Sequence, residues 1–103
     1  MHYFALFAAG LFLCNCLPHL AAGLQGRPFP SPFATPHGVG DSRPLVNVLW
    51  GMFNLVAGLL LLAANPVTIG VNPDFAALIF GALVLGIFAS WHFGKVQASK
   101  KRE

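Results

Sequence analysis

Three apolar runs set the strongest limit on how this chain of 103 residues can fold. They cover residues 3–24, 45–64 and 75–93, and none of them contains Asp, Glu, Lys or Arg. Each run is close to the ~20 residues that a helix needs to cross the hydrocarbon core of a bilayer. Because backbone amides in lipid need partners within their own segment, we expect all three runs to be helices.

The composition supports a membrane location. Only 9% of the residues are charged and 56% are hydrophobic, whereas a soluble domain carries about a quarter of charged residues. Most of the surface must therefore face lipid or another apolar partner. The sequence predicts an all-α, polytopic membrane protein of the plasma or inner membrane, with a single domain that covers residues 1–103.

Turn-forming residues divide the chain into five segments. These are a first helix over about 3–24, a Pro/Gly-rich loop over 25–43, a second helix over about 44–64, a third helix over about 73–94, and a basic tail over 95–103. Asn72 is expected to cap the third helix, with Pro73 at its first position. Ser42 and Pro44 give the second helix a similar start.

The basic residues indicate the orientation. All six lie in the 25–43 loop or in the 95–103 tail, which are on the same side of a three-pass chain. The positive-inside rule makes that side cytoplasmic and places the N-terminus outside.

An alternative treats residues 1–22 as a cleaved signal peptide. The start, MHYFALF, lacks the basic segment of such peptides, and cleavage would move the basic tail outside.

The Asn, Ser and His side chains within the spans concentrate toward the cytoplasmic ends. They are Asn15, His19, Asn47, Asn54, Ser90 and His92. With a rise of ~1.5 Å per residue, Asn15 and Asn54 fall near the midplane and the other four near the inner boundary. We therefore expect these six side chains to line a polar pocket in the cytoplasmic half.

Helix packing is predicted from the spacing of small residues. In the second run, amides and glycines alternate at steps of four, three and four, at Asn47, Gly51, Asn54 and Gly58. Residues at this spacing share one face. Glycines let a neighbouring helix approach closely, and amides can then form hydrogen bonds across the contact. Gly81 and Gly86 are expected to have the same role in the third helix.

The segment GRPFPSPFATPHGVGDSRP, residues 26–44, contains five prolines and three glycines. Proline limits the entropy that a loop loses when it becomes ordered. Phe29 and Phe33 are too apolar for a free linker, so we expect these two residues and His37 to form a cap over the polar pocket. A loosely ordered tether is the alternative.

Pro18 is expected to kink the first helix and to make room at its cytoplasmic end.

The functional hypotheses follow from the absence of acids in the spans. Asp41, Asp74 and Glu103 are the only acids, and all lie outside the apolar runs. Catalysis and carboxylate-driven transport are therefore not expected, and neither a cofactor nor a metal is required. Nucleic-acid binding is not expected either, because the basic tail is assigned to anionic lipid headgroups. The first hypothesis is a channel or transport-type protein, or an accessory subunit, in a homo-oligomer or larger membrane complex. The alternative is a redox subunit that holds haem b or a quinone between His19 and His92.

Overall fold

The structure, a computed structural model, describes residues 1–101 and is mostly helical. Its helices are α1 (His2–Leu24), α2 (Pro44–Ala64) and α3 (Pro73–Lys101). Two short antiparallel strands, β1 (Phe29–Pro30) and β2 (Asp41–Ser42), pair within the segment between α1 and α2. All three helices are long and apolar enough to cross a membrane. The prediction of three helices of spanning length is confirmed.

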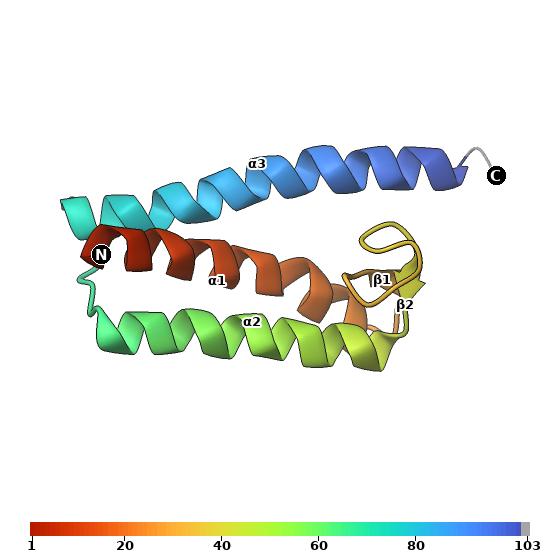
Figure 1. Cartoon of the computed structure of the whole chain (residues 1–103), viewed down its shortest axis with the longest axis horizontal. Helices are drawn as coiled ribbons and strands as arrows, with labels where there is room; N and C mark the ends of the chain where they lie inside the picture. The colour runs from red at the N-terminus through yellow and green to blue at the C-terminus, as the bar shows by residue number, and fades with distance from the viewer. Residues whose placement is uncertain (102–103) are drawn as a thin grey trace.

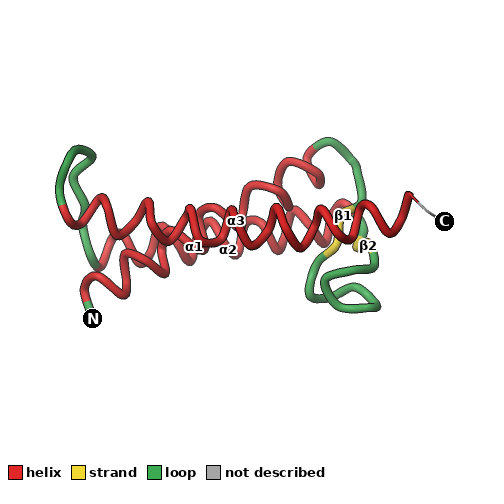
Figure 2. Tube along the Cα trace, turned by 90° about the horizontal axis from the view of Figure 1, so that it is seen from above, coloured by secondary structure: helices red, strands yellow, loops and turns green. Residues whose placement is uncertain are grey.

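The three helices run along the long axis of a molecule with extents of 46 × 24 × 21 Å (Figure 1). α1 lies between α2 and α3 and packs against both, while α2 and α3 contact each other very little. The 25–43 loop lies at the same end as the C-terminus, and the turn between α2 and α3 lies at the end of the N-terminus (Figures 1 and 2). α1 is therefore the helix on which the other two are assembled.

α2 packs against α1 through the predicted stripe. The buried residues of α2 are the four that alternate amide and glycine: Asn47, Gly51, Asn54 and Gly58. A Cβ atom added to Gly51 would lie 2.7 Å from Cγ of Leu20. One added to Gly58 would lie 2.6 Å from Cγ of Leu13. Both distances are too short for real atoms, so the missing side chains are what let the two helices approach.

α3 packs against α1 through a second pair of glycines, nearer the other end of the bundle. A Cβ atom on Gly10 would lie 2.7 Å from the backbone nitrogen of Ala82, and one on Gly81 would lie 2.8 Å from the carbonyl carbon of Phe7. The backbones thus touch almost directly. The sequence analysis identified Gly81 but missed Gly10. Gly86 also faces α1, where an added Cβ atom would make an ordinary contact of 3.8 Å with Cys14 Sγ.

α1 and α3 diverge toward the end that carries the loop (Figure 1). Pro18 lies in this last part of α1, which stays helical to Leu24. At Gly23, α1 is still tightly packed on α2, since an added Cβ atom would lie 2.7 Å from the carbonyl oxygen of Pro44. The expected opening at the end of α1 is therefore away from α3 and not away from α2.

The predicted end of the third helix is wrong. α3 does not stop near residue 94 but continues to Lys101, so residues 95–101 of the basic tail are helical. The physical reason is that no proline or glycine follows Gly94, and the Lys, Gln and Ala residues beyond it favour a helix. Arg102 and Glu103 lie outside the described residues.

The helix starts match the sequence in one case out of two. Asn72 caps α3, because its Oδ1 accepts a hydrogen bond from the backbone N–H of Phe75 at 2.8 Å. Ser42 does not cap α2. Its hydroxyl lies 2.6 Å from that of Ser31 instead, and α2 begins with Pro44 at its first position and no side-chain cap. Ser42 therefore forms its hydrogen bond within the loop and does not have the capping role that was predicted for it.

The end of the bundle opposite the loop is closed by His2. Its Nδ1 lies 3.2 Å from Oδ1 of Asn65, and its Nε2 lies 3.0 Å from Oδ1 of Asp74. Asn65 follows α2 and Asp74 belongs to the first turn of α3. One side chain from the start of α1 thus connects the ends of all three helices.

Substitution of the α3 glycines tests the close approach of α1 and α3. Gly81→Ala places a methyl group against the backbone of Phe7, and overpacking of this kind costs about 1–3 kcal/mol. We expect a lower midpoint in thermal unfolding in detergent, followed by circular dichroism. Gly94→Ala is the matched control, because nothing lies within 4 Å of an added Cβ atom there. Equal midpoints for the two variants would contradict this packing.

Candidate functional site

Four of the six predicted polar residues meet in two hydrogen bonds between α1 and α2. Nδ2 of Asn15 donates to Oδ1 of Asn54 at 3.1 Å. One turn further along α1, Nδ1 of His19 lies 2.8 Å from Oδ1 of Asn47. The predicted two layers of polarity are therefore two cross-links between the same pair of helices, one near the middle of the span and one near the loop.

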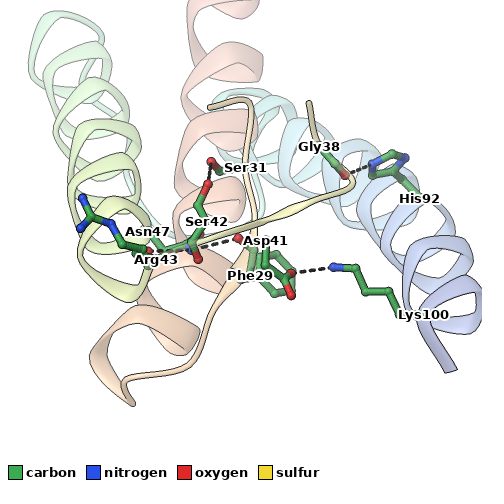
Figure 3. A network of polar contacts seen from close by, with 9 residues as sticks. All are labelled: Phe29, Ser31, Gly38, Asp41, Ser42, Arg43, Asn47, His92 and Lys100. Carbon is green, nitrogen blue, oxygen red and sulfur yellow. Dashed lines mark hydrogen bonds and ion pairs between the residues drawn. The ribbon is translucent and has the colours of Figure 1, made fainter. Parts of the chain in front are cut away.

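Asn47 is the centre of the second layer. Its side chain is fully enclosed, at 0% exposure. Its Nδ2 donates to three backbone carbonyls of the loop, those of Phe29 (3.0 Å), Ser42 (3.2 Å) and Arg43 (3.3 Å) (Figure 3). Since Nδ2 faces carbonyls, Oδ1 is the atom that faces His19. The imidazole therefore carries a proton on Nδ1 and donates it to Asn47.

Phe29 covers this layer. The His19 ring is 2% exposed and meets the ring of Phe29 edge-on, with centroids 5.5 Å apart. Phe29 in turn contacts Phe93 of α3 at 4.8 Å, and Trp50 of α2 completes the enclosure of His19 at 6.4 Å. One loop aromatic thus occupies the space between the diverging ends of α1 and α3.

The loop is also bound to α3 at two points (Figure 3). Nε2 of His92 donates to the carbonyl of Gly38 at 2.8 Å. Nζ of Lys100 pairs with Oδ1 of Asp41 at 2.6 Å. The second contact depends on the helical extension of α3, because without it Lys100 would not be held above the loop. The loop is therefore bonded to α2 and α3 and packs on α1.

Phe33 and His37 lie on the outside of the loop. Phe33 is 64% exposed and rests against the ring of Trp50 with centroids 5.3 Å apart. His37 is exposed, and its Nδ1 donates to the carbonyl of Pro32 at 2.6 Å. The structure therefore assigns the covering role to Phe29 alone among the three residues that the sequence analysis grouped as a cap.

The remaining predicted residues do not join this cluster. Ser90 is exposed and donates to the carbonyl of Ile87 within its own helix. His19 and His92 each have a separate hydrogen-bond partner, and the ring of Phe93 contacts both imidazoles, at 6.5 and 5.0 Å. Within residues 1–101, no three His, Cys, Asp or Glu side chains gather in a way that could hold a metal ion.

Two contributors to this site are not among the residues predicted from the sequence: Phe93, and the pair of Asp41 with Lys100. Asp41 could have been found, because it is the one acid in a loop predicted to lie on the same side as the basic tail.

Comparison of the chain with protein-family models, with characterised proteins and with solved structures finds no match. The function is therefore inferred from the geometry of the site.

The role of Asn47 can be separated from that of Asn54. Asn47→Leu leaves the His19 imidazole and the loop carbonyls of Phe29 and Ser42 without the Asn47 side chain as their partner, while the Arg43 carbonyl keeps the backbone N–H of residue 47. Each buried polar group left unpaired costs about 1–3 kcal/mol. We expect proteinase K to cut the 25–43 loop much faster in this variant, with helical circular dichroism retained. Asn54→Leu is the control, since a single hydrogen bond between membrane helices averages only about 0.6 kcal/mol. Equally slow cleavage in both variants would show that Asn47 does not hold the loop.

The two loop phenylalanines should also behave differently. Burial of a Phe side chain stabilises by about 1.5–3 kcal/mol, so Phe29→Ser should release the loop to proteinase K and expose His19 to a water-soluble histidine reagent. Phe33→Ser should have a clearly smaller effect, because Phe33 is already exposed. A larger effect at Phe33 than at Phe29 would contradict the assignment of the cap.

Proposed function

We propose that this chain is a three-span integral membrane protein that acts, without catalysis, as an accessory subunit of a homo-oligomer or larger membrane complex. Its N-terminus lies outside and its C-terminus in the cytoplasm of a plasma or inner membrane. The observation that carries the proposal is that polar side chains in the spans form hydrogen bonds with one another and with the loop. Asn47 and His19 fix the 25–43 loop, and the loop is the surface offered at the cytoplasmic end.

The hydrogen bonds favour an accessory role over a channel. A conducting path needs polar groups that face a shared passage. Here the polar side chains lie in the contact between α1 and α2, where Asn15 bonds to Asn54 and His19 bonds to Asn47. The hydrogen-bonding groups that would line a path are thus already occupied within the chain.

The outer faces of the helices support a larger assembly. Only Gly81 and Val96 are buried in the described part of α3. Large apolar side chains are exposed along α2 and α3, among them Leu49, Phe53, Leu60, Phe80, Leu83, Ile87 and Trp91. Such faces suit lipid tails or further helices, and helices in a bilayer associate through packing of this kind.

The proposed topology is tested with reporter fusions. Reporters inserted at residue 35 and placed after the C-terminus should both be active in the cytoplasm, because the basic residues lie at that end. A reporter in the turn between α2 and α3 should be active outside. A C-terminus found outside would overturn the orientation and with it the cytoplasmic position of the loop.

The accessory role is tested with proteoliposomes. The purified protein should leave the flux of small ions and solutes at the level of empty liposomes, measured with entrapped dyes. A leak that Asn15→Leu or Asn54→Leu changes would favour the channel hypothesis instead. Gly94→Ala, which meets no neighbouring atom, serves as the control for reconstitution.

Haem or quinone binding is the second candidate. The hydrogen bonds of His19 and His92 favour it. Each imidazole donates one ring N–H to a protein oxygen, which leaves the other nitrogen with a free lone pair. Histidines that bind metals are commonly oriented in this way. Access to His19 requires Phe29 to move, since the loop encloses the ring. The visible absorption spectrum of the purified protein decides this: a Soret band lost in His19→Ala supports haem.

A further inference from the structure

A cleft opens at the loop end of the bundle, where α1 and α3 diverge. Its volume is about 460 Å³. It is lined by Pro18, Ala21, Ala22, Arg27, Pro28, Phe29 and Gln97. One wall is thus formed by the last turns of α1, the floor by the start of the loop, and the opposite wall by the extension of α3.

The cleft is about half polar and half apolar. Its polar side chains all lie beyond the apolar runs, where Pro28 and Phe29 share the lining with them. The alanines and Pro18 belong to the spanning part of α1. Arg27 follows the end of α1, and Gln97 belongs to the part of α3 beyond the apolar run. A ligand in this cleft would therefore meet apolar side chains on the membrane side and hydrogen-bond donors at the level of the headgroups.

The charges around the cleft favour an anion. Within residues 1–101, Asp41 pairs with Lys100 and Asp74 with His2, so neither carboxylate neutralises the exposed Arg27. Lys101 lies four residues beyond Gln97 and therefore on the same face of α3. An added Cβ atom at Gly94, three residues before Gln97, would meet nothing within 4 Å. This face of α3 is thus open at Gly94, and it carries a second cation, Lys101, one helical turn beyond Gln97.

We propose that this cleft binds the phosphate of an anionic phospholipid. Arg27 would hold the phosphate through its guanidinium fork, which matches phosphate oxygens. The Gln97 amide would donate a further hydrogen bond, and the glycerol and first acyl carbons would rest on the alanines and Pro18. Basic pockets between helices at the cytoplasmic side suit such headgroups. The inference rests on the membrane insertion proposed above.

Lipid retention tests the site. The protein is purified in nonionic detergent with equal amounts of phosphatidylglycerol and phosphatidylcholine that have the same acyl chains, and retained lipid is counted by native mass spectrometry. We expect a preference for phosphatidylglycerol that Arg27→Gln lowers about fivefold, since one basic residue near a surface contributes roughly 1 kcal/mol. Arg43→Gln is the matched control. Arg43 is an exposed arginine of the same loop that does not line the cleft.

A second variant leaves the charge in place and fills the cleft. Ala21→Phe should reduce phosphatidylglycerol retention as Arg27→Gln does, with helical circular dichroism unchanged. Equal losses in Arg27→Gln and Arg43→Gln, or retention in Ala21→Phe as in the wild type, would overturn the proposal. Displacement of the lipid by millimolar glycerol 1-phosphate would point to a site for soluble phosphate and overturn the lipid assignment. Micelles impose no orientation, so a failure here is distinct from a failure of the topology test.

Discussion

The structure depends on one buried amide more than on any other polar group. A buried polar group without a partner costs free energy in any apolar interior, and in a membrane no water can replace the missing partner. Asn47 meets this requirement with His19 on one side and three loop carbonyls on the other. The strands β1 and β2 are only two residues long, and the further backbone hydrogen bonds between Ser31 and Gly40 join the loop only to itself. The amide bonds the loop to α2 and, through His19, to α1, so that the helix pair and the loop become one unit.

That amide is in place only because the helices come close. Gly51, one turn from Asn47, lets α2 approach Leu20 of α1, and the same approach places the imidazole within hydrogen-bond distance of the amide. Gly10 and Gly81 do the same for α3 at the other end of the bundle. The two glycine contacts lie at different levels along α1. α3 is therefore held close near the N-terminus and is free to diverge toward the loop.

Much of this could be predicted from the sequence, since the relevant signals are local. Spacing alone identified the face of α2, and depth placed Asn15 with Asn54 in one layer and His19 with Asn47, Ser90 and His92 in another. Depth did not show that His19 bonds to Asn47 and not to His92. The sequence gives no signal for Gly10, because the other glycine of its apolar run, Gly23, is thirteen residues away and no glycine recurs at helical spacing. Its role becomes visible only when α3 is placed against it.

The contacts of the loop could not be predicted from the sequence. Phe29 and Phe33 are equivalent in the sequence, each next to proline and four residues apart. Which one faces the helices is decided by the carbonyl of Phe29, because its hydrogen bond to Asn47 fixes the path of the chain at that point. The pair of Asp41 and Lys100 likewise depends on an extension of α3 beyond the apolar run. Long-range contacts of this kind follow from tertiary structure and leave no periodic pattern.

The uneven distribution of polarity also bears on where this protein would be recognised. Toward the N-terminal end, α1 and α3 meet through glycines and apolar side chains, apart from the exposed contact of His2 with Asp74. Glycine and apolar contacts distinguish poorly between one apolar partner and another. At the loop end, directional hydrogen bonds fix a surface with a defined shape, and this surface includes the exposed Arg27, which has no ion pair within residues 1–101. Specific recognition needs fixed polar groups, and these are concentrated at that end. The loop face therefore carries the directional groups of this molecule, while the exposed faces of α2 and α3 are apolar.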